Sequence, residues 1–203
     1  MLRALVPVLV SLVLRPPATE PRPVSPRSLD APLTSRALPN GLFNPMPHGI
    51  VGGYPADTGL DIAGFHLPVY AIAAGTLVYS EAGHTRWATD DRAVLVELDE
   101  PIRVTGADGT SRRITHVWYA HLSALRFEQP RDHPAPRQVA AGELLGISGI
   151  ANQSPHLHLG LLLDGVTDQR AGSFLLDDDC RRALGGLRRG QRLVSASRSN
   201  RAQ

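Results

Sequence analysis

A chain of 203 residues is long enough for one domain with a buried core, and its formal net charge of +2 is too small to indicate a nucleic-acid partner. Cys180 is the single cysteine, so the sequence excludes an internal disulfide and any metal site made of cysteines alone. We expect this thiol to be buried and unreactive.

The N-terminal segment is apolar. Residues 1–18 begin MLRALVPVLVSLVL, a run that is too short to span a bilayer and has the length of a signal-peptide core. We therefore expect an exported protein, extracellular or in the periplasm and cell envelope, with no membrane-spanning segment in the mature chain. A small-residue cleavage site is missing, which leaves a plain apolar tail as the alternative. Residues 19–41 are rich in proline, and this composition predicts a disordered linker.

Alternating apolar residues predict one mostly β, antiparallel domain over residues 42–186. Strands are expected within 66–83 with a bend at Gly75, at 92–104 and 112–122 joined by a hairpin turn at Asp108-Gly109, at 142–150, and at 154–163. Residues 173–184 predict a short C-terminal helix capped by Ser173. Residues 187–203 are rich in arginine and serine and are expected to form a flexible tail.

Strand alternation sorts the histidines of segment 112–122. His116 and Trp118 fall on one face, whereas Tyr119 and His121 fall on the other. His116 and His121 should therefore not serve the same site unless a bulge intervenes, and we expect His116 at the surface. Trp118 and Tyr119 are interpreted as packing residues.

The segment SPHLHLG carries two histidines one residue apart. On a strand, His156 and His158 point to the same side, while Leu157 and Leu159 point to the opposite side, into a core. A pair of imidazoles on one face favours a metal or catalytic site. Taken alone, however, the pair fits better with two solvated histidines on a half-exposed strand, so the rest of the sequence has to decide.

Two further segments add chemistry to this pair. DTGLDIAG carries Asp57 and Asp61, which share one face if the segment is extended, and WYAHL carries His121. Carboxylate and imidazole groups are ordinary ligands of hydrolytic zinc, which needs about three protein ligands and one open position. The remaining imidazoles can then transfer protons or stabilise an oxyanion.

With these segments, the sequence resembles the lysostaphin/LytM-type metallopeptidases, the M23 family of cell-wall endopeptidases. The motifs GLDIA, PVYAIAAGTLVYSEAG, WYAHLS, VAAGELLGISG and PHLHLGL occur in family order. The resemblance implies an antiparallel β-sheet groove domain that binds one zinc ion and cleaves peptidoglycan peptides. It assigns zinc binding to Asp61 and His158, places Asp57 at the remaining ligand position, and makes His121 and His156 catalytic.

Asp57 stands where the family has a histidine, and this departure leaves alternatives open. Asp57 can still bind zinc through a carboxylate oxygen, giving a site that also suits harder ions such as manganese, or His66 can supply the missing imidazole. If the metal is lost, the resemblance implies a catalytically degenerate domain that regulates the cell envelope or activates a wall amidase. A non-catalytic carbohydrate- or lipid-binding domain is a further alternative, which exposed aromatic residues along the groove would favour.

Overall fold

The structure is a computed structural model in which residues 22–23, 34–85, 89–105, 109–170 and 172–194 are described. The segment expected to be a signal peptide, most of the proline-rich linker, and the turn residue Asp108 lie outside the described residues. Nowhere in the described ranges is a helix both long enough and apolar enough to cross a membrane.

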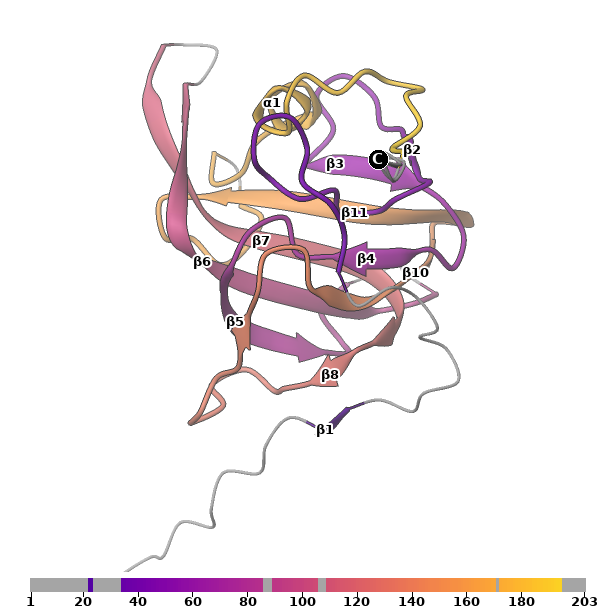
Figure 1. Ribbon diagram of the computed structural model, residues 1–203, viewed down its shortest axis with the longest axis vertical. Coiled ribbons are helices and arrows are strands. Elements are labelled where there is room, and N and C mark those ends of the chain that lie inside the picture. The colour runs from indigo at the N-terminus through magenta and orange to yellow at the C-terminus, as the bar shows by residue number, and fades with distance from the viewer. Residues whose placement is uncertain (1–21, 24–33, 86–88, 106–108, 171, 195–203) are drawn as a thin grey trace, which may run out of the picture.

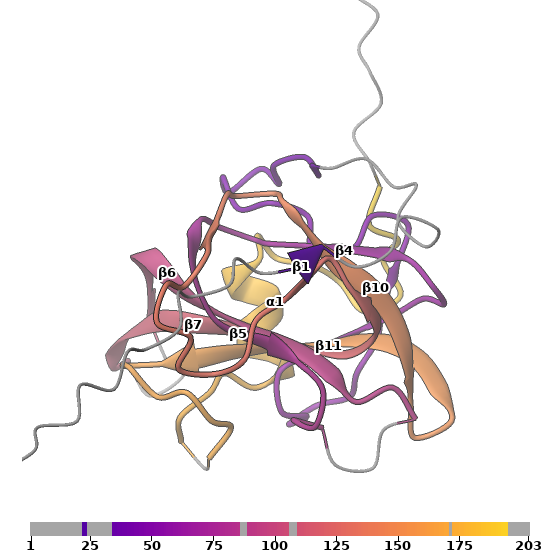
Figure 2. The ribbon, with the colours of Figure 1, turned by 90° about the horizontal axis from the view of Figure 1, so that it is seen from below.

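Antiparallel strands form nearly all of the regular structure, as the sequence predicts (Figure 1). The main sheet has nine strands in the order β2-β3-β11-β10-β7-β6-β5-β9, with β4 paired to β10. These strands are β2 (Ile50–Val51), β3 (Leu60–Ala63), β4 (Pro68–Tyr70), β5 (Gly75–Glu81), β6 (Arg92–Thr105), β7 (Ser111–Leu125), β9 (Gln138–Val139), β10 (Leu144–Ala151) and β11 (Ser154–Leu163). Strands β1 (Arg22–Pro23) and β8 (Phe127–Glu128) form a separate pair. The sheet is strongly curved (Figure 2).

Strand β11 is the centre of the fold for function, because it pairs with both β3 and β7. In this register His158 lies opposite Asp61 of β3 on one side and opposite Ala120 of β7 on the other. Strands β6 and β7 form the expected long hairpin, whose last recorded pair is Thr105 with Ser111. Segments almost a hundred residues apart in sequence therefore become direct neighbours.

The hydrophobic core lies behind β11. Leu157, Leu159 and Leu161 are fully buried, as strand alternation predicts, and they join one large apolar cluster with residues of β3 and β7. Helix α1 (Asp177–Ala183) packs against this cluster through Cys180, which is also fully buried. Each apolar side chain removed from water in this way stabilises the fold by roughly 1.5–3 kcal/mol.

Ordered structure extends beyond the expected domain limits at both ends. Thr34 bridges to Glu143, so the described part of the chain before residue 42 is packed on the domain. Leu187 and Leu193 are buried in the core cluster, and Arg192 bridges to β2. The expectation of a flexible tail from residue 187 is therefore wrong for residues 187–194, because their leucines fill the core.

The C-terminal helix is present but begins later than expected. Its N-cap is Leu176, and no side chain caps it. Ser173 instead lies in the preceding loop, where its hydroxyl accepts a hydrogen bond from the backbone N–H of Arg170. The prediction of Ser173 as the helix cap is wrong, since tertiary contacts hold this serine in the loop.

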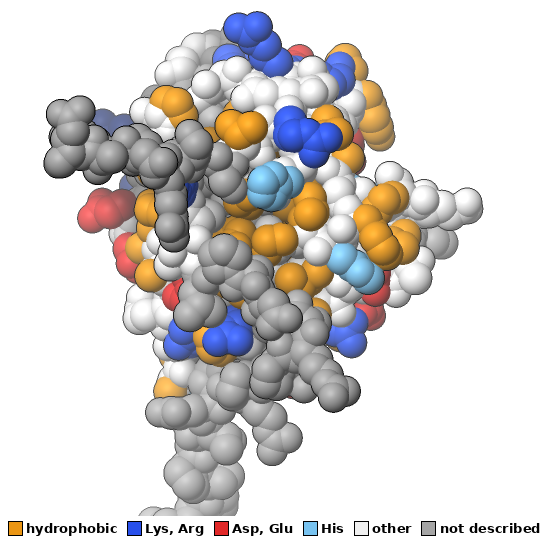
Figure 3. All heavy atoms as spheres, turned by 45° about the vertical axis from the view of Figure 1, so that its right-hand side comes forward, with side chains coloured by type: hydrophobic (Ala, Val, Ile, Leu, Met, Phe, Trp, Pro, Cys, Tyr) orange, Lys and Arg blue, Asp and Glu red, His pale blue; other side chains and the backbone are white. Residues whose placement is uncertain are grey.

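Apolar side chains are also exposed at the surface. Figure 3 shows such side chains gathered on one face of the molecule, with arginine and histidine side chains among them. Among the described residues, the large apolar side chains that remain exposed are those of Ile50, Tyr54, Phe65, Leu176 and Val194.

Candidate metal and catalytic site

An open pocket of about 610 Å³ lies at the edge where β3, β7 and β11 meet. It is lined by Gly52, Gly53, Tyr54, Asp57, Thr58, Asp61, Ala63, Trp118, His121, Asn152, Ser154, His156, His158 and Gln169. The pocket therefore brings together the five residues to which the motif resemblance gave a metal or catalytic role: Asp57, Asp61, His121, His156 and His158.

Asp61 and His158 form the closest polar pair in this set. Nδ1 of His158 lies 2.9 Å from Oδ1 of Asp61. Burial by itself raises the pKa of Asp61, but the hydrogen bond from His158 and the electrostatic influence of the neighbouring histidines outweigh it and lower the pKa below its usual value. Gly59, at φ +80°, leaves the room for this ring, because a Cβ there would lie 3.0 Å from Nε2 of His158.

His156 is held with a free ring nitrogen facing the pocket. Its Nδ1 lies 2.9 Å from the carbonyl oxygen of Ser154, and because a carbonyl only accepts, Nδ1 must carry the proton. In the neutral ring Nε2 therefore keeps its lone pair. Nε2 lies 3.8 Å from Oδ1 of Asp61, so the basic nitrogen faces the same space as the Asp61–His158 pair.

His121 reaches the pocket because the backbone of β7 is irregular at this residue. Its φ is +64°, and the pairing of β7 with β10 shifts register next to it, between Leu122 and Ala124. Strand parity assigned His121 to the face of Tyr119, but the structure places it with Trp118 on the pocket side, so that prediction is wrong. The His121 ring lies edge-on to His156, with centroids 4.9 Å apart.

Burial and, after it, unfavourable electrostatic interactions with His158 and His156 lower the pKa of His121 to about 3. The ring is therefore neutral at physiological pH. Within the described residues, its buried Nδ1 has no hydrogen-bond partner. A neutral imidazole with an unused polar atom is suited to hydrogen bonding with a substrate group rather than to charge pairing.

Asp57 lies in a turn and not in an extended segment, since Gly59 separates it from β3 with a positive φ. Its Oδ1 accepts a hydrogen bond from the backbone N–H of Thr58 at 2.8 Å, and its carbonyl accepts one from the N–H of Asp177. Burial, followed by the negative charge of Asp61, raises the pKa of Asp57. The two carboxylates are thus close enough to repel each other.

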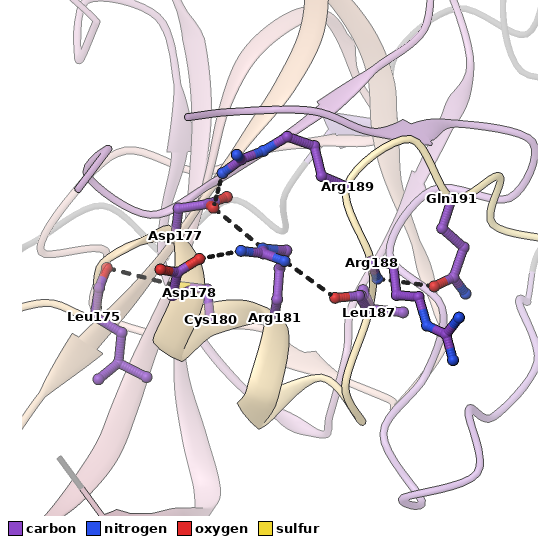
Figure 4. A network of polar contacts seen from close by, with 9 residues as sticks. All are labelled: Leu175, Asp177, Asp178, Cys180, Arg181, Leu187, Arg188, Arg189 and Gln191. Atoms are coloured by element: carbon purple, nitrogen blue, oxygen red, sulfur yellow. Dashed lines mark hydrogen bonds and ion pairs between the residues drawn. The ribbon is translucent and has the colours of Figure 1, made fainter. Parts of the chain in front are cut away.

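Helix α1 holds the turn that contains Asp57 in place. Asp177, whose side chain is fully buried, forms ion pairs with Arg181 and Arg189 and connects the helix to the segment that follows it (Figure 4). Its backbone N–H in turn holds the carbonyl of Asp57 at 3.0 Å. The third expected ligand is therefore positioned by an ion-pair network outside the pocket.

The chemistry of the donors fits a divalent cation, although their positions are not yet those of a ligand set. Two mutually repelling carboxylates and an imidazole would all be stabilised by a shared cation. However, the described part of the chain holds no group of three or more His, Cys, Asp or Glu side chains with donor atoms gathered as in a metal site.

His66 does not complete the site. It is exposed, stacks on Phe65 with ring centroids 3.8 Å apart, and is not among the residues that line the pocket. His116, expected at the surface, is buried in β7 beside Thr115, so that expectation is wrong. In the sheet it lies between Glu97 of β6 and Leu162 of β11.

Two pocket residues were missed by sequence reasoning. Trp118 lies edge-on to His158, with centroids 5.6 Å apart, and lines the pocket instead of only packing, whereas Tyr119 is buried as expected. Gln169, from the loop after β11, places its amide 3.0 Å from Nε2 of His158. Strand parity places Trp118 on the face opposite His121 and so could not indicate its place beside the pocket, and no sequence signal marks Gln169.

No family model matches the chain, and no curated protein matches it. Among solved structures, it is similar to a Pseudomonas aeruginosa protein assigned to peptidase family M23, with 21% identity over 76% of this chain and a TM-score of 0.47. This chain spans 56% of the length of that protein.

Two further solved structures are similar. The catalytic domain of lysostaphin from Staphylococcus simulans is 23% identical over 61% of this chain and 86% of that domain, with a TM-score of 0.41. A variant of the catalytic domain of the prophage-encoded M23 protein EnpA from Enterococcus faecalis is 18% identical over 66% of this chain and 95% of that domain, with a TM-score of 0.44.

Proposed function

We propose that this chain is a metal-dependent endopeptidase that cleaves the peptides of cell-wall peptidoglycan. The observation that carries the proposal is the convergence of Asp61, His121, His156 and His158 from three different strands on one open pocket.

The donor types suggest one zinc ion held by Asp57, Asp61 and His158. Such an ion supplies a Lewis acid that makes a water molecule more acidic and polarises a peptide carbonyl. Because two carboxylates and one neutral imidazole cancel the charge of the ion, we expect weaker Lewis acidity than with two histidines, and a greater tolerance of manganese.

The two remaining histidines have separate roles in this proposal. Nε2 of His156 takes the proton from the attacking water, since Nδ1 is already bonded to the carbonyl of Ser154. His121 is neutral at physiological pH, so its N–H donates a hydrogen bond to the developing oxyanion and does not act as a strong acid. The proton held by His156 then passes to the leaving amine.

The substrate class and the location of the protein follow from the motif resemblance. Peptidoglycan peptides are the substrates of the family that the motifs resemble, and the apolar residues 1–18 agree with export to the cell envelope.

The second candidate is a catalytically degenerate domain that acts as a cell-envelope regulator, with a wall amidase as its partner. Two observations favour it: Asp57 occupies a ligand position that the motif pattern gives to histidine, and no described cluster of donors is gathered for a metal. A domain of this kind would leave purified peptidoglycan intact and stimulate an added amidase.

Zinc binding to the metal-free protein, measured by titration calorimetry, separates the two candidates. We expect one zinc ion per chain, lost in Asp57→Ala and retained in the matched control His66→Ala, together with chelator-sensitive digestion of purified peptidoglycan that His156→Ala abolishes. A wild-type protein that binds no zinc, with binding restored by Asp57→His, would overturn the peptidase proposal in favour of the degenerate domain.

A further inference from the structure

The amide of Gln169 contacts the outer nitrogen of His158. Its Nε2 lies 3.0 Å from Nε2 of His158, on the side of the ring away from Asp61. Gln169 belongs to the loop between β11 and α1, and it is partly buried. The imidazole of His158 is thus held between a carboxylate on one nitrogen and a carboxamide on the other.

This arrangement determines which nitrogen of His158 carries the proton. An amide NH₂ group only donates, so Nε2 of His158 must accept from Gln169 and cannot carry a proton. The proton then lies on Nδ1, where it is donated to the carboxylate of Asp61 at 2.9 Å. Both hydrogen bonds are satisfied by the same tautomer, and each therefore reinforces the other.

The same tautomer cannot bind a metal in the pocket. The nitrogen that faces Asp61 is Nδ1, and a cation shared with Asp61 needs the lone pair of that nitrogen. The proton must leave Nδ1 to the solvent, and a proton from the solvent must join Nε2, so that the net charge of the ring is unchanged. Nε2–H then needs an acceptor, which Gln169 can supply only if its amide turns to present the oxygen.

We propose that Gln169 is a positioning residue that selects the protonated nitrogen of His158 through the orientation of its amide. The amide nitrogen faces the ring in the metal-free protein, and the amide oxygen faces it when a divalent cation is bound. This inference rests on the proposed function, because it takes the cation to lie between Asp61 and His158.

The absence of a side chain at Gly160 gives the Gln169 amide room to contact His158. A Cβ at Gly160 would lie 2.7 Å from Nε2 of Gln169, so only glycine at this position of β11 lets the amide reach the histidine. Trp118, which lies edge-on to His158, would be 3.4 Å from the same Cβ. The amide, the indole and the imidazole therefore lie next to one another on this wall of the pocket.

The first experiment uses the metal-free, nitrogen-15-labelled protein and long-range proton–nitrogen correlation spectra at pH 8, which distinguish Nδ1–H from Nε2–H. We expect only Nδ1–H for His158 in the wild type and the appearance of Nε2–H beside Nδ1–H in Gln169→Glu, because carboxylates, which can only accept, would then face both ring nitrogens. Gln138→Glu, on the exposed strand β9, adds the same charge elsewhere and should leave the spectrum unchanged.

The second experiment titrates zinc into the same proteins. Ligand-supporting partners of a metal-bound histidine change affinity by about 10–100-fold, so Gln169→Glu should bind zinc about tenfold more tightly than the wild type. Gln169→Leu should bind it about tenfold more weakly, because Nε2–H loses its acceptor. Gln138→Glu should match the wild type.

The two readouts separate the failure of this inference from the failure of the proposed function. The same His158 tautomer in the wild type, Gln169→Glu and Gln169→Leu would overturn the role of Gln169, whatever the zinc affinity. A wild type that binds no zinc would overturn the proposed metal site and the cation-coupled half of the inference, while the tautomer spectra would still decide whether Gln169 selects the proton.

Discussion

Asp177 and Asp178 are adjacent residues whose carboxylates both form ion pairs with Arg181 but differ in burial (Figure 4). Replacing each by alanine therefore measures how much burial of an ion pair adds to the free energy of unfolding. The Asp177 side chain is fully buried, and its Oδ2 accepts hydrogen bonds from Nε of Arg181 at 3.1 Å and from Nη2 of Arg189 at 2.7 Å. The Asp178 side chain is 54% exposed.

The expected magnitudes follow from this difference. Breaking a buried ion pair costs roughly 3–5 kcal/mol, because the surviving charge is left uncompensated. The side chains of Arg181 and Arg189 are 19% and 39% exposed, so water partly stabilises them once Asp177 is gone. We therefore expect Asp177→Ala to lower the free energy of unfolding by about 3 kcal/mol, and Asp178→Ala to lower it by about 0–1 kcal/mol.

Equilibrium unfolding in urea measures both values. A double-mutant cycle between Asp177→Ala and Arg189→Ala then isolates the coupling of the buried pair, which should exceed the coupling between Asp178 and Arg181. If Asp177→Ala and Asp178→Ala cost the same within about 0.5 kcal/mol, burial does not decide the strength of these pairs, and the argument is refuted.

Three further outcomes are expected. Tyr119→Phe should cost about 1–3 kcal/mol in urea unfolding, because the N–H of Ile72 loses the buried hydroxyl that accepts it at 2.8 Å. Gly59→Ala should weaken zinc binding in calorimetry, since its methyl group would press on His158. In the presence of a chelator, the contribution of His121 to the free energy of unfolding should be full above pH 6.5 and fall toward pH 3, because the unfolded chain protonates His121 in this range while the folded chain, in which its pKa is about 3, does not. His121→Asn should flatten this pH dependence. An unchanged slope in the variant would contradict the lowered pKa of His121.

Much of the fold could be predicted from the sequence because the signals are local. The alternation of Leu157, Leu159 and Leu161 with His156 and His158 depends only on the two-residue period of a strand, and both sides of β11 have the expected character. The expected hairpin of β6 and β7 is likewise present. The limits of the domain were harder to predict, since the burial of Leu187 and Leu193 depends on a core assembled from distant strands.

The same distinction between local sequence signals and long-range contacts applies to the site. The sequence by itself determined which chemical groups are available: two carboxylates at Asp57 and Asp61 and three imidazoles on strand-like segments. The motif resemblance supplied a role for each of them, and these roles remain predictions. Neither source could predict that Gln169, in a loop without a motif, would contact His158.

Only the tertiary structure decided how these groups face one another. Pairing of β11 with both β3 and β7 sets the 2.9 Å contact between Asp61 and His158, and a positive φ at His121 turns that side chain from the face of Tyr119 into the pocket. The physical reason is that strand period is a property of neighbouring residues, whereas register, bulges and loop contacts are set by whichever long-range packing buries the most apolar surface while satisfying the backbone.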